Sequence, residues 1–200
     1  MWQVEDWERL QQRWNAFWEL AIVDRPIVLV SAPLPGVAPV TASTEGTPEQ
    51  RAMDLDYQLR LFEAGVKSTY FGGDNFPCYT PYLGAGVLAA YLGSPVEFAE
   101  TTTWFHPALT SLENTPLPEL DPANRYWQAT LAMTRAAAAQ APGNYIVGIT
   151  DLGGVTDVLA SLLGAETLLM AMLESPEVVA RWLAHLTQVW LQAYRTLVDL

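Results

Sequence analysis

The sequence has few basic residues, a single cysteine and only two histidines, and each shortage excludes a class of protein. It has 10 Lys and Arg against 22 Asp and Glu, which gives a net charge of -12. The basic residues are scattered singly, so nothing is present to neutralise a phosphate backbone, and we expect no nucleic-acid partner. Because Cys78 stands alone, no intramolecular disulfide can form, and a cytoplasmic location is expected.

Long apolar runs are also missing. The longest weakly polar stretch, residues 129–141, is interrupted by Thr, Arg and Gln and is shorter than the roughly 20 apolar residues that span a bilayer. The first residues, from Met1 onward, have neither the basic start nor the continuous apolar segment of a secretory signal. The sequence therefore predicts a soluble protein with no membrane partner.

Apolar and aromatic residues, in contrast, are abundant. Half of the 200 residues are hydrophobic, and the chain has 8 Trp, 8 Tyr and 6 Phe. Side chains of this kind must be buried in a core, which excludes a disordered chain. No linker or repeat divides the sequence, so residues 1–200 are predicted to be a single domain.

Apolar spacing and turn residues predict alternating helices and strands. Three helices should begin at an N-cap residue followed by proline, namely Thr47-Pro48, Asp121-Pro122 and Ser175-Pro176. The alternation indicates a mostly parallel α/β fold. The helices are expected at residues 2–22, 48–64 with Gly65 as the stop, 87–92, 121–140, 155–163 and from 176 onward; the strands at 27–30, 66–71 and 145–150; and an extended segment or hairpin at 96–105.

Several short motifs resemble the uroporphyrinogen decarboxylase-like superfamily, which also includes methylcobalamin-dependent methyltransferases. They are YFGGDNFP at 70–77, YLGAG at 82–86, VGITD at 147–151, LLG at 162–164 and LESPEVV at 173–179. The resemblance implies an α/β fold of the (β/α)8 TIM-barrel type. This chain would carry roughly the first half of that barrel, since a closed one needs about 250 residues.

One departure from the family changes the expected substrate. True decarboxylases have a Met-Arg-Gln-Ala-Gly-Arg-Tyr motif after the first strand, whose arginines hold the carboxylates of the porphyrinogen. Here residues 31–37 read SAPLPGV. A substrate with many carboxylates needs charge-assisted partners to leave water. We therefore expect an enzyme related to this lyase that acts on a small molecule other than uroporphyrinogen.

Two aspartates are the candidate catalytic residues. Asp74 and Asp151 each follow a predicted strand, and in barrels of this type the carboxyl ends of the strands form the active-site mouth. By the resemblance, Asp74 matches the aspartate that accepts hydrogen bonds from the pyrrole N–H groups in decarboxylases. The alternative for both residues is a structural cap on the turn or helix that follows.

Four further residues are candidates for substrate binding. Asn75 and Tyr79 lie near Asp74 in a loop whose glycines let the backbone approach a ligand closely, and they could line a pocket or simply pack the loop. His106 could act as an acid or base, or hold a structural position. Asp157 could converge on the mouth with Asp151, or could stabilise the positive N-terminus of its own helix.

No metal site or cofactor is expected within these residues, because Cys78 alone lacks the partners that zinc requires. The alternative of a corrinoid-dependent methyltransferase would place zinc ligands beyond Leu200 and would add a corrinoid protein as a partner. A third alternative is a non-catalytic barrel that serves as a binding or assembly partner. A homo-oligomer fits each of these alternatives.

Overall fold

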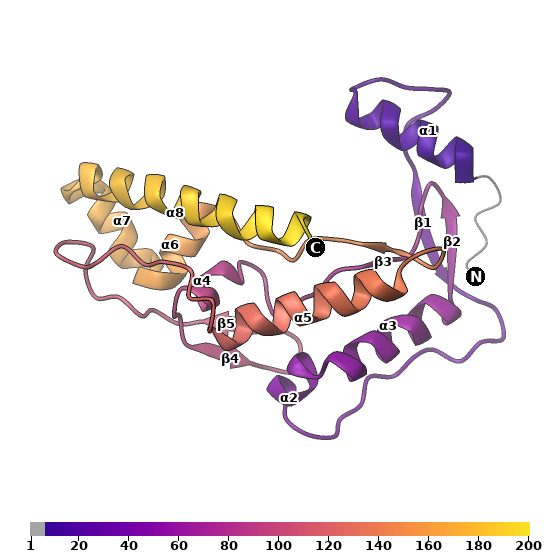
Figure 1. Cartoon of the computed structure of the whole chain (residues 1–200), viewed down its shortest axis with the longest axis horizontal. Coiled ribbons are helices and arrows are strands. Elements are labelled where there is room, and N and C mark those ends of the chain that lie inside the picture. Colours follow the sequence, from indigo (N-terminus) through magenta and orange to yellow (C-terminus); the bar gives the residue numbers. More distant parts are fainter. Residues whose placement is uncertain (1–6) are drawn as a thin grey trace. The chain divides into compact units, whose positions relative to one another are not determined.

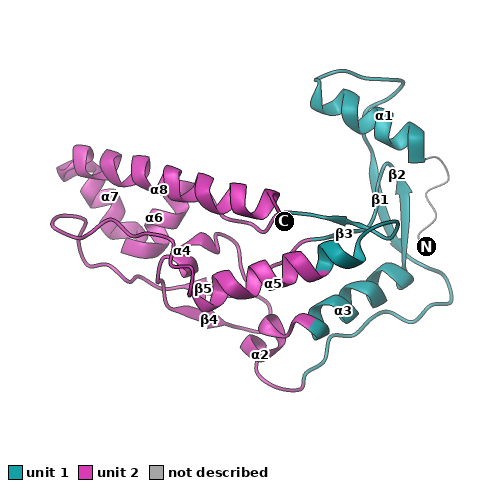
Figure 2. Ribbon diagram, viewed as in Figure 1, with its two compact units in different colours: residues 1–44, 56–79, 137–148 teal, residues 45–55, 80–136, 149–200 magenta. Residues whose placement is uncertain are grey.

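The computed structural model describes residues 7–200, which form two compact units (Figure 2). Unit 1 contains residues up to 44 together with 56–79 and 137–148, and unit 2 contains residues 45–55, 80–136 and 149–200. The chain passes between the units several times. Both units mix helices with small sheets, so the predicted α/β class is confirmed in this general form (Figure 1).

Unit 1 holds two sheets of two strands each. β1 (Leu29–Pro33) pairs antiparallel with β2 (Thr69–Gly73), and β3 (Cys78–Tyr79) pairs parallel with β6 (Ile146–Val147). The helices of this unit are α1 (Trp7–Trp18) and most of α3 (Leu55–Ser68). The helix predicted over residues 2–22 is observed as α1, which ends at Trp18, four residues earlier than predicted; residues 2–6 lie outside the described part of the chain.

The expected parallel arrangement of the strands is only partly observed. The first and second strands are antiparallel, and among residues 7–200 the sheets have two strands each and form no barrel. A continuous apolar run indicates a strand that can be buried on both faces, but it carries no information on the direction of its partner. Strand direction is decided by contacts between distant parts of the chain.

The helix predicted over residues 48–64 is in fact two helices. α2 (Pro48–Met53) begins with the expected capping box at Thr47, but Asp54 adopts an extended conformation and α3 starts directly after it. Gly65 does not stop α3, which continues to Ser68, and the Gly65 carbonyl accepts hydrogen bonds from the hydroxyls of Ser68 and Thr69 at 3.0 and 2.7 Å. The second strand consequently begins at Thr69, three residues later than predicted.

Unit 2 contains the main hydrophobic core. α4 (Leu88–Tyr91), α6 (Val155–Leu163) and α8 (Pro176–Val198) bury a continuous set of apolar side chains, with Trp182 and Leu186 of α8 fully buried. β4 (Val96–Phe98) and β5 (Thr103–Phe105) form the predicted hairpin. α7 (Ala165–Glu174) was not predicted, because Gly164, which ends α6, also serves as the N-cap residue of α7.

The start of α5 (Arg125–Gln140) differs from the prediction. Asp121 was expected to be its N-cap, but the residue that accepts hydrogen bonds from the first helical N–H groups is Asn124, whose Oδ1 lies 2.9 and 3.1 Å from the nitrogens of Tyr126 and Trp127. Asp121 instead forms a short turn with the N–H of Ala123.

No single helix within residues 7–200 is both long enough and apolar enough to cross a membrane. α6 and α7 reach that length and hydropathy only when taken together, and they are bent by 107° relative to each other.

Candidate functional site

Asp74 lies directly after β2 and is the only fully buried carboxylate among the described residues. Both terminal nitrogens of Arg25 donate to it, Nη2 to Oδ1 at 3.0 Å and Nη1 to Oδ2. Arg13 Nη1 lies 3.1 Å from Oδ1, and the Val28 N–H group donates to Oδ2 with its nitrogen 3.0 Å away. Each carboxylate oxygen therefore accepts two hydrogen bonds, which uses its full acceptor capacity.

The environment of Asp74 favours its charged form. Burial by itself raises the pKa of this carboxyl, but the Val28 N–H group and the guanidinium groups of Arg25 and Arg13 outweigh burial and hold the pKa below its usual value. Asp74 is consequently an ionised acceptor with no proton to give. In this arrangement the Asp74 carboxylate connects α1 and the segment before β1 to the end of β2.

A second aspartate extends the charged cluster to five residues. Asp24 accepts from Arg13 at 2.7 and 2.8 Å and from Arg9 at 2.8 Å, and these hydrogen bonds lower its pKa and raise the pKa of Arg13. The order of pairing is Arg9, Asp24, Arg13, Asp74 and Arg25. This cluster joins α1 to the segment before β1 and to the end of β2.

Asn75 and Tyr79 have structural contacts in the same unit. The Asn75 amide nitrogen donates to the carbonyl of Val30 and to the Ser31 hydroxyl at 3.1 and 2.7 Å, so it ties the turn to β1. Tyr79 is buried, and its ring centroid lies 5.2 Å from that of Phe62. Burial raises the pKa of Tyr79 to about 12, so its hydroxyl stays protonated at neutral pH.

Asp151 belongs to unit 2 and is exposed. Its Oδ1 accepts from the Gly153 N–H at 2.9 Å, and its main-chain carbonyl accepts from the Val87 N–H at 3.1 Å. Within residues 7–200 no hydrogen bond or ion pair is found for its other carboxylate oxygen. Asp151 is thus an exposed residue that is held in place by its backbone and by one carboxylate oxygen.

The loop that carries Asp151 is packed tightly against another glycine-containing loop. Gly153 has a φ of +76°, and a Cβ atom added there would lie 2.6 Å from Cα of Gly86. Trp190 of α8 donates from Nε1 to the Gly153 carbonyl at 2.9 Å. The two loops therefore approach closely at Gly86 and Gly153. The hydrogen bond from the Val87 N–H to the Asp151 carbonyl also joins them, and α8 anchors one of them.

Asp157 and His106 are exposed residues of unit 2 with local roles. A Cβ atom at Gly154 would lie 2.9 Å from Oδ2 of Asp157, so this carboxylate folds over the first residues of α6. That position agrees with stabilisation of the helix N-terminus. His106 pairs through Nε2 with Oε2 of Glu97 across the β4–β5 hairpin at 2.9 Å.

The predicted site residues are thus divided between the two units. Asp74, Asn75 and Tyr79 belong to unit 1, whereas Asp151, Asp157 and His106 belong to unit 2. Sequence reasoning missed Arg13 and Arg25 as partners of Asp74. The available signal was the scarcity of basic residues, because each arginine in so acidic a chain is a candidate partner for a buried carboxylate.

Among residues 7–200, no group of three or more His, Cys, Asp or Glu side chains is placed to hold a metal ion. Comparison of the chain with protein-family models, curated proteins and solved structures finds no match.

Proposed function

We propose that these residues form part of the wall of a (β/α)8 barrel of the uroporphyrinogen decarboxylase-like type, carrying roughly its first half. The observation that supports this most directly is the parallel pairing of β3 with β6 across a connection that contains α5. Parallel strands joined through a helix are the repeating unit of such barrels. The motifs at 70–77 and 147–151 agree with the same family.

The segment that runs into β1 leaves apolar side chains uncovered, although the antiparallel pairing of β1 with β2 departs from the all-parallel wall of such a barrel. Val28, Leu29 and Val30 are 47%, 55% and 42% exposed, although successive residues of a strand point to opposite faces. Both faces of this segment are therefore apolar and uncovered. In a barrel wall, interior side chains cover one face and an outer helix covers the other.

The active site of the proposed enzyme includes Asp151. This residue follows a strand paired in parallel, its loop is held by Trp190, and its side chain is exposed with only one carboxylate oxygen in a hydrogen bond among the described residues. Such a carboxylate can accept a hydrogen bond from a substrate N–H group or stabilise a cationic intermediate. A catalytic role for Asp74 stays a prediction. It requires Arg13 or Arg25 to give up a hydrogen bond to the carboxylate, so that one carboxylate oxygen can accept from a substrate.

The reaction we propose is decarboxylation of a small carboxylic acid other than uroporphyrinogen. The chain carries no arginine in residues 31–37 to hold a porphyrinogen. The test is release of carbon dioxide by the complete protein from a panel of small carboxylic acids that includes uroporphyrinogen. Asp151→Asn should lower turnover at least about 100-fold, the low end for loss of a group that stabilises charge in the transition state.

The matched control is Glu166→Gln, which removes an exposed carboxylate of α7 and should leave turnover unchanged. Turnover of uroporphyrinogen, or an unchanged rate in Asp151→Asn, would contradict the proposal. The methyltransferase alternative makes a different prediction, namely zinc bound to the complete protein, which metal analysis measures directly.

A further inference from the structure

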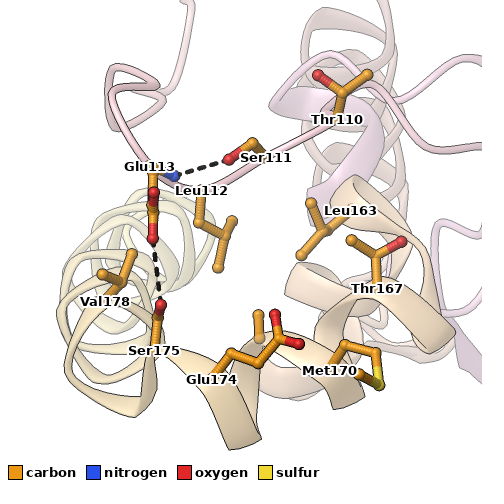
Figure 3. Close-up of a pocket in the computed structure, with 11 residues that line it drawn as sticks. Thr110, Ser111, Leu112, Glu113, Leu163, Thr167, Met170, Glu174, Ser175 and Val178 are labelled. Atoms are coloured by element: carbon orange, nitrogen blue, oxygen red, sulfur yellow. Dashed lines mark hydrogen bonds between the residues drawn. The ribbon is translucent and has the colours of Figure 1, made fainter.

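We draw no further inference here: the strongest candidate, the depression in unit 2 between residues 110–113, α7 and the first turn of α8 (Figure 3), rests on the exposed carboxylates of Glu113 and Glu174, and among residues 7–200 nothing points to a ligand that would occupy it.

Discussion

Arg25 and Asp74, 49 residues apart in the sequence, form a two-point ion pair in which Arg25 Nη2 lies 3.0 Å from Asp74 Oδ1 and Nη1 bonds the other oxygen. The carboxylate is fully buried, whereas the arginine side chain is 35% exposed. Arg13 and the Val28 N–H complete the set of donors. The pair thus fixes the segment before β1 against the end of β2.

Replacing Asp74 with Asn should destabilise the protein by about 2 kcal/mol. The change removes the charge that Arg25 and Arg13 share, and hydrogen bonds to charged groups are worth roughly 1.5–3 kcal/mol; the partial exposure of Arg25 lets water offset some of the loss. The midpoint of urea unfolding measures the effect. Asp151→Asn is the control and should stay within about 0.5 kcal/mol, because Asp151 is exposed. Equal shifts in the two variants would contradict the anchoring role.

The stability of the chain should fall in acid. The pKa values of Asp74 and Asp24 are lowered in the folded state from a usual value of 3.8. Carboxyls of this kind contribute stability that is complete above the unfolded pKa and is lost as the pH falls through the folded pKa.

Urea unfolding midpoints measured between pH 6 and pH 3 should therefore be level at first and decrease below about pH 4. The decrease should be shallower in Asp74→Asn, which lacks one of the two groups. A variant with the same acid dependence as the parent chain would show that Asp74 does not contribute.

Gly153→Ala should destabilise unit 2 more than Gly143→Ala destabilises unit 1. Both glycines have a φ of +76°, so both substitutions carry the same left-handed strain, of about 1–2 kcal/mol. Only at Gly153 does the new Cβ meet another backbone atom, Cα of Gly86 at 2.6 Å, because the space around Gly143 is open. Unfolding midpoints of the two variants give the difference, which reports the loop contact. Similar losses would mean that the loops separate easily.

Asn124→Ala should cost about 2 kcal/mol, and Asp121→Ala less than about 0.5 kcal/mol. Asn124 caps α5, and its side-chain nitrogen also donates to the carbonyls of Ala90 and Tyr91 at 3.0 and 3.3 Å. Its removal leaves helix N–H groups without their acceptor and takes a donor from the Tyr91 carbonyl, whereas the Ala90 carbonyl keeps the Gly93 N–H. Thermal unfolding of the two variants distinguishes them. A larger loss in Asp121→Ala would restore Asp121 as the cap.

Local features of the chain were predictable from the sequence. The α6 helix lies at residues 155–163 as expected, the hairpin forms between Val96 and Phe105, and Thr47 caps α2. In each case the deciding interactions join residues close together in the sequence. Asn124 was missed because Asp121 offers the same local signal, and only the contact of Asn124 with Ala90 and Tyr91 separates the two.

The sequence by itself determined the α/β class and the positions of several short-range elements, because hydrophobic period, capping and turn chemistry act over a few residues. The tertiary structure alone decided that β1 and β2 run antiparallel, that Arg13 and Arg25 saturate Asp74, and that Gly86 meets Gly153. These contacts join residues tens of positions apart. Apolar runs and single charges do not specify which distant partner they meet, since that choice depends on the packing of the whole chain.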